Sequence, residues 1–201
     1  PLPSVARKAL AVLGDDVVGD ALPALPIVDP SKLRHLEAGT WTYRIETGAR
    51  RGQDQVVRVE PLPADGQGPR WRLVTDGDDI QTLVVTTDHV VVKERQTDLQ
   101  SDRTIVYRPG LVLEPGMAVG ESKSVEAVLE TRKQSRPDKV EYEGSLSYTI
   151  RYIGMYRVKT PAGSFDARLL EQLRDRLASV LLRAKPIERL FLLLPGVLNK
   201  D

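Results

Sequence analysis

YRVKTPAGSFDARLL, residues 156–170, contains the most informative turn signal in the chain. Pro161 presets the backbone dihedral wanted at the second position of a type I turn, and Gly163 suits the left-handed position that follows in a bulged hairpin. The flanking residues alternate as they do along half-buried strands. The apolar series are Tyr156 and Val158 before the turn, and Phe165, Ala167 and Leu169 after it. The stretch therefore predicts a structural corner between two antiparallel strands, in which Pro161 and Gly163 are turn residues.

The same two-residue alternation occurs through much of the preceding chain. In GTWTYRIET, residues 39–47, Trp41, Tyr43 and Ile45 alternate with polar residues, which predicts a half-buried strand. DIQTLVVTTDHVVVKER, residues 79–95, places two β-branched runs on either side of a polar turn and predicts a hairpin.

Short strands punctuated by the tripeptides RPG, residues 108–110, and EPG, residues 114–116, are predicted next. Strands at this spacing, without long helical patterns between them, favour an antiparallel sheet. The predicted fold class is mainly β: a curved antiparallel sheet or half-barrel, spanning residues 31–170.

Both ends of the chain differ from this pattern. After Ser4, apolar residues at helical spacing predict a short helix that ends near Gly14, and the prolines of residues 21–30 predict an extended connection. We therefore expect residues 1–30 to form an N-terminal helix and a Pro-rich arm. Residues 168–185 satisfy both a helical and a strand pattern, so residues 171–201 are expected to be a helical or extended appendage that packs on the domain or on a partner.

The bulk composition excludes several classes of protein. Twenty-nine Lys and Arg residues against 28 Asp and Glu residues give a net charge of +1, spread along the chain, which disfavours nucleic-acid binding. The chain has no cysteine, which removes disulfides and thiolate chemistry. No apolar run reaches the roughly 18 residues that a membrane-spanning helix needs, so the chain is expected to be peripheral to a membrane at most.

The candidates for chemistry are few. The sequence holds two histidines, His35 and His89, and neither has a partner pattern that favours catalysis over a structural position. TDGDDIQ, residues 75–81, gathers three aspartates but lacks the spacing of a calcium loop, and a solvated turn is favoured. The basic residues before position 140 (Arg132, Lys133, Arg136, Lys139) are interpreted as a solubilising loop. We expect no catalytic residue, cofactor or metal.

Three stretches carry a family resemblance: LEAGTWTYRIE (36–46), LVLEPGMAVGESKSVEAV (111–128) and GMYRVKTPAGSFDARLL (154–170). Together they resemble the DUF3108-like family of β-rich bacterial envelope proteins over roughly residues 33–170. The residues that match its pattern are Gly39, Trp41, Tyr43, Pro115, Gly116, Gly120, Val158, Thr160, Pro161, Ala162, Gly163, Phe165, Asp166 and Ala167.

The resemblance implies a fold similar to the LolA/LolB-like curved sheets, which wrap a helix or an apolar ligand, and a location in the periplasm or at the outer membrane. It implies no catalytic residues. The chain starts at Pro1, and we leave open whether a signal peptide preceded it.

Two functional hypotheses follow, and an enzyme ranks third. The first is a non-catalytic, envelope-associated binding or structural protein, a subunit that contacts other proteins through its terminal segments, whose apolar faces need a cover. The alternative is a periplasmic carrier that holds a lipid-like apolar molecule in the concave face of the sheet. Alternation alone suggests the residues that would line this site: Trp41, Tyr43, Val84 and Val91.

Overall fold

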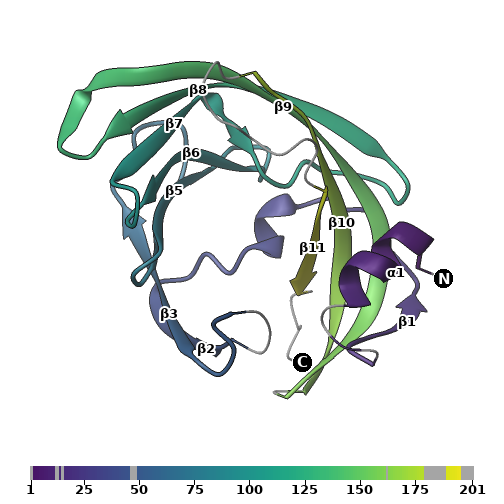
Figure 1. Cartoon of the computed structure of the whole chain (residues 1–201). Coiled ribbons are helices and arrows are strands. Elements are labelled where there is room, and N and C mark those ends of the chain that lie inside the picture. The colour runs from purple at the N-terminus through teal and green to yellow at the C-terminus, as the bar shows by residue number, and fades with distance from the viewer. Residues whose placement is uncertain are drawn as a thin grey trace.

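A computed structural model describes residues 2–11, 14, 16–45, 49–161, 163–178 and 189–195. In this part of the chain, ten strands form one antiparallel sheet in the order β11-β10-β9-β8-β7-β6-β5-β4-β3-β2, and its two end strands are not paired with each other. The sheet curves around a segment near the N-terminus (Figure 1). The predicted fold class, a mainly β protein with a curved antiparallel sheet, is confirmed.

Most neighbours in the sheet are consecutive in sequence, because tight turns join antiparallel strands. The strands are β2 (Gly39–Arg44), β3 (Asp54–Leu62), β4 (Arg70–Thr75), β5 (Asp79–Val85), β6 (Val91–Asp98), β7 (Arg103–Val112), β8 (Ser122–Lys133), β9 (Arg136–Thr160), β10 (Gly163–Ala178) and β11 (Arg189–Pro195).

The predicted corner at Pro161 is present. β9 ends at Thr160 and β10 begins at Gly163, which pairs directly with Thr160. The φ angle of Gly163 is +134°, a conformation that side-chain-bearing residues rarely adopt. The hairpin predicted within residues 79–95 is also confirmed, because β5 and β6 pair around the turn that follows Val85.

The RPG tripeptide does not end a strand as predicted. β7 runs through it, and the extra residues form a bulge: Val106 pairs with Arg95, and Leu111 pairs with Lys93. Four residues of β7 thus lie opposite Glu94 alone. A bulge accommodates the turn-forming residues without ending the pairing.

Residues 168–178 of the ambiguous C-terminal pattern form a strand, and residues 179–185 of that pattern lie outside the described residues. β10 pairs with β9 from Gly163 to Ala178, and β11 extends the sheet beyond β10. Leu169 and Leu170 are adjacent in β10 and are buried in different clusters, Leu170 with Tyr152 and Leu169 with Tyr156, as expected for side chains on opposite faces of a strand. Pairing with the 25-residue β9 stabilises the extended form over the helical one. The sheet therefore continues past residue 170.

The N-terminal segment is part of the fold. The helix α1 (Ser4–Leu10) buries Ala6 and Leu10 against Tyr156 and Leu169. β1 (Val18–Leu22) then pairs with the final part of β9, beyond Arg151, the last residue of β9 that pairs with β8. The apolar face of the helix is thus covered by the chain's own sheet.

The connection from β1 to β2, residues 23–38, crosses the concave face of the sheet, and we call it the strap (Figure 1). It includes a short 3-10 helix, η2 (Pro30–Leu33). Ile27 and Leu33 of the strap are buried in the main core cluster. The other residues of this cluster are Tyr107, Leu111, Met117, Ala127, Leu129, Leu146, Tyr148, Ile150, Tyr152 and Leu170. The strap therefore fills the apolar part of the concavity.

Candidate functional site

Backbone and side-chain hydrogen bonds hold the strap on the sheet. Ile27 and Met117 exchange two backbone hydrogen bonds of 2.7 and 3.1 Å. The Tyr152 hydroxyl donates to the carbonyl oxygen of Leu25 at 3.2 Å. Pro23 and Pro26 cannot donate backbone hydrogen bonds in the first part of the strap, so these contacts satisfy backbone groups that would otherwise lie unpaired against an apolar face.

A buried ion pair follows η2. The guanidinium of Arg34 contacts the carboxylate of Glu114, which is fully buried directly after β7. Burial raises the pKa of Glu114 to about 7, although the Arg34 charge acts in the opposite direction. Tyr148 donates its hydroxyl to the Val112 carbonyl close by, and burial followed by the Glu114 charge raises its pKa. The strap thus meets the sheet at a charged site inside the core.

Two apolar residues of the strap are exposed. Leu25 is 68% exposed and Val28 is 85% exposed, although their neighbour Ile27 is buried. Val119, which is 46% exposed, follows Met117 by two residues, as Leu25 precedes Ile27 by two. Because the bridge between Ile27 and Met117 is antiparallel, Leu25 and Val119 lie at the same end of it. We call Leu25, Val28 and Val119 the strap patch.

A pocket of about 660 Å³ lies at the β7 bulge, and we call it the bulge pocket. Its apolar lining comes from Leu62, Val84, Val92, Val106, Tyr107, Pro109, Gly110 and Val112, and its polar lining from Gln67, Arg70, Thr82, Thr86, Glu94 and Arg95. Val84, Val92 and Val112 are register partners across β5, β6 and β7, so they share one face. The strap packs on the opposite face, where Leu111 joins the core.

The four residues predicted to line a ligand site do not lie on one surface. Register through β3, β4 and β5 puts Trp41 and Tyr43 on the same face as Val85, the partner of Val91. Val84 therefore lies on the other face, where it lines the bulge pocket. Val91 is completely buried, whereas Tyr43 is 51% exposed on the end strand β2. The structure brings none of the other three to the bulge pocket.

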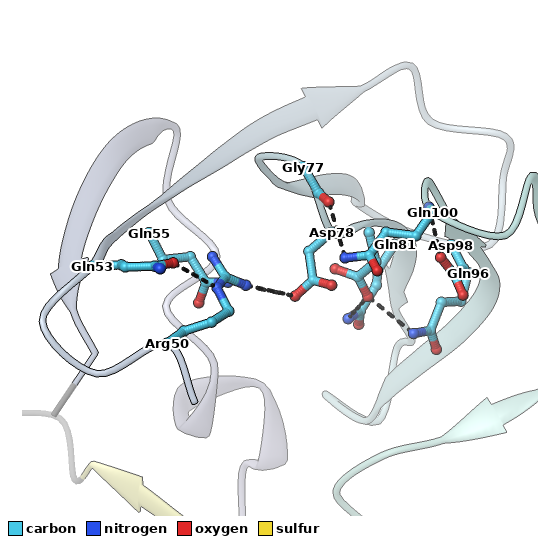
Figure 2. A network of polar contacts seen from close by, with 10 residues as sticks. Arg50, Gln53, Gln55, Gly77, Asp78, Gln81, Gln96, Asp98 and Gln100 are labelled. Carbon is cyan, nitrogen blue, oxygen red and sulfur yellow. Dashed lines mark hydrogen bonds and ion pairs between the residues drawn. The ribbon is translucent and has the colours of Figure 1, made fainter. Parts of the chain in front are cut away.

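The aspartates after β4 have separate protein partners. Asp76 forms an ion pair with Arg58 at 2.8 Å. Asp78 accepts a hydrogen bond from Gln55 at 3.5 Å and lies 3.8 Å from the Arg50 guanidinium (Figure 2). These side-chain contacts therefore connect the turn between β4 and β5 to β3 and to the loop before β3.

The third aspartate, Asp79, continues this network. It accepts hydrogen bonds from Gln81 at 2.8 Å and from Gln96 at 3.0 Å. Gln100 adds a contact to the carbonyl oxygen of Gly77, and Figure 2 shows it beside Gln81. Within the described residues, no group of three or more His, Cys, Asp or Glu side chains is arranged to hold a metal ion.

Neither histidine lines the bulge pocket. His89 occupies the β5–β6 turn with a φ of 59°, and its ring nitrogen lies 3.9 Å from Asp29 of the strap rather than beside the adjacent Asp88. His35 packs edge-on against Trp41 at 4.8 Å between ring centroids and lies 3.5 Å from Glu37. Both positions connect the strap region to neighbouring elements.

The basic residues around the β8–β9 turn are largely neutralised. Arg132 forms an ion pair with Glu130 at 2.5 Å. Lys133 and Arg136 share Glu141, at 3.8 and 3.3 Å. This distribution of charge supports a solvated hairpin more than an anion-binding surface.

Sequence reasoning missed Glu114 and the bulge. The sequence signal for Glu114 was a carboxylate enclosed by apolar residues in LVLEPGM, residues 111–117. A charged residue in such a run is seldom buried unless it is paired. Its partner, Arg34, lies 80 residues earlier, and no local pattern links the two positions.

Comparisons with known proteins add no relative. No family model, no curated protein and no solved structure matches this chain. None of the helices in the described part has the length and apolar character that crossing a bilayer requires.

Proposed function

We propose that the protein is a non-catalytic, envelope-associated binding protein that contacts another protein through the strap patch. The observation that carries this proposal is the contrast in burial among neighbouring apolar residues of the strap. Ile27 faces the core, and Leu25 and Val28 are exposed by 68% and 85%. Exposed apolar side chains that lie a few residues apart on an ordered backbone are candidates for an interaction site.

The position of the patch favours a protein partner. The Ile27–Met117 bridge and the Tyr152 hydroxyl fix the backbone on which the patch residues stand. A partner that buries a preorganised surface loses less conformational entropy on binding than one that must order it. The terminal helix is already packed on the sheet, so the strap, and not α1, is the part of residues 1–30 that we propose for the contact.

The carrier hypothesis ranks second. In its original form the ligand occupies the concave face, and in this structure Ile27 and Leu33 of the strap fill the apolar part of that face. A lipid-like molecule would have to displace them. The location that we propose, periplasmic or peripheral to the outer membrane, rests on the family resemblance.

Site-specific photo-crosslinking in cells tests the proposed contact. A photoreactive residue at Leu25 or at Val28 should give the same discrete protein adduct, identified by mass spectrometry. The matched control is the exposed Lys139 on the β8–β9 hairpin, which should not give it. The purified adduct partner should then bind the wild-type protein and lose binding to a Leu25→Ser/Val28→Ser variant. Equal adducts from all three positions, or binding that the double variant retains, would contradict the proposal.

A further inference from the structure

The bulge in β7 gives the sheet a concave site on the face opposite the strap. Between Val106 and Leu111, residues 107–110 lie opposite Glu94 alone, so the backbone of β7 departs from regular pairing there. Tyr107, Pro109 and Gly110 thereby enter the lining of the bulge pocket. Bulges often occur beside functional sites because they redirect side chains.

The lining of the bulge pocket is apolar at its centre. Val84, Val92 and Val112 form a row across three paired strands, and Val106 extends it along β7. Val84 is only 1% exposed, although it lies on the face away from the strap. The volume of about 660 Å³ is within the range of roughly 300–1,000 Å³ typical of small-molecule sites. An aliphatic group would therefore find both space and contacts.

Two arginines line the pocket, and they differ in whether nearby carboxylates compensate their charge. The Arg70 guanidinium pairs with Glu94 at 2.6 Å and with Asp65 at 3.1 Å, so two carboxylates compensate its charge. Arg95 is exposed and has no ion-pair partner among the described residues. A carboxylate from a ligand would therefore find its counter-charge at Arg95, where the planar guanidinium can donate two parallel hydrogen bonds.

We propose that the bulge pocket binds an aliphatic carboxylate, with its chain on the valine row and its carboxylate at the Arg95 guanidinium. No residue of the strap patch lines the pocket, so this site is independent of the proposed protein contact. Burial of the chain supplies most of the affinity, and the charge-assisted hydrogen bonds select an anion over a neutral or cationic amphiphile.

Isothermal titration calorimetry of the full chain tests this assignment with three probes that share a ten-carbon alkyl chain and differ in head group. Decanoate should bind in a saturable manner, and decanol and decyltrimethylammonium at least about tenfold more weakly, as expected for the loss of a charge-assisted hydrogen bond. Absence of decanoate binding, or equal affinity for the three probes, would overturn the proposal.

Substitutions locate the site. Arg95→Gln should reduce decanoate affinity to the level of decanol, and Arg95→Lys should restore part of the difference. The control Lys139→Gln, at an exposed position outside the pocket, should change neither. Val106→Phe fills the pocket and should abolish binding of both probes, and Val112→Phe serves as a second filling variant if the first unfolds. Unchanged decanoate affinity in Arg95→Gln or in a folded filling variant would disprove the site.

The two proposals can fail separately. A Leu25→Ser/Val28→Ser variant should bind decanoate as the wild type does, because neither residue lines the pocket. Weaker decanoate binding in that variant would indicate that the ligand binds at the strap, and it would overturn the assignment to the bulge pocket.

Discussion

Glu114 and Arg34 form an ion pair in which the carboxylate is completely buried and the guanidinium side chain remains 30% exposed. Arg34 follows η2 in the strap, and Glu114 follows β7 in the sheet. The pair therefore joins two segments that are distant in sequence through a charged contact inside the core. Breaking a buried pair leaves an uncompensated charge, which is costly.

The Glu114 carboxyl should make stability depend on pH. Its pKa is about 7 in the folded protein, and about 4.5 is the ordinary value expected for the unfolded chain. The stabilisation from its bound proton is fully present below pH 4.5 and is lost as the pH rises through 7. The free energy of unfolding of the wild type, minus that of Glu114→Gln, should therefore fall by on the order of 3 kcal/mol across this interval.

Urea unfolding at a series of pH values measures this difference. Glu126→Gln is the matched control, because Glu126 is exposed on β8, and its difference from the wild type should vary far less with pH. A difference for Glu114→Gln that rises with pH would show that the Arg34 charge outweighs burial and that the pKa is lowered instead.

Truncation of neighbouring residues of the strap should change the free energy of unfolding by very different amounts. Ile27 is 3% exposed within the core, so Ile27→Ala should lower the free energy of unfolding by about 2–4 kcal/mol. Val28 is 85% exposed, and Val28→Ala should change it by less than about 0.5 kcal/mol. Chemical denaturation of both variants checks the pair. Similar small effects would mean that the strap does not pack on the sheet in solution.

The backbone φ angle of Gly163, and not a lack of space, should make a side chain at this position destabilising. A Cβ atom there would meet the Phe165 ring at 3.8 Å, an ordinary contact, but φ is +134°. Gly163→Ala should therefore cost about 1–2 kcal/mol of stability. The exposed neighbour Ser164 provides the control, since Ser164→Ala should be nearly neutral. Equal thermal midpoints for the two variants would rule out this turn geometry.

Docking of α1 on the sheet should protect it from trypsin. Arg7 and Lys8 are exposed cleavage sites within the helix, and buried Leu10 holds the helix on the sheet. Leu10→Ser should raise the cleavage rate at these sites at least about tenfold by promoting local opening. Ser4→Ala should leave the rate within about twofold, because Ser4 is exposed and the N-cap of the helix is Pro3. Rapid cleavage in the wild type would indicate a detached helix.

Local patterns predicted the elements that local physics determines. The turn at Pro161 and the β5–β6 hairpin follow from residue types whose backbone preferences act within four positions. Alternation predicted the strand at Trp41 but overestimated its burial, because alternation does not reveal that β2 is an end strand. Residues 168–178 fitted two periods, and pairing with β9 decided between them.

Contacts between distant segments lay beyond sequence reasoning. Prolines excluded a helix in the strap, but nothing in the composition showed that Ile27 would meet Met117. RPG carries the signal of a turn, and only the register of β6 with β7 shows that it forms a bulge. The proposed pocket depends on that register. The face that Val84 occupies depends on the pairing of β2 through β5, which alternation within single strands does not reveal.

The pairing of β1 with β9 has a consequence for synthesis on the ribosome. Val18 pairs with Val158, 140 positions later, so β1 cannot pair until most of the sheet has been synthesised. During that interval the apolar side chains of α1 lack their partners Tyr156 and Leu169. Such a high contact order slows folding and leaves apolar surface exposed to a chaperone in the nascent chain.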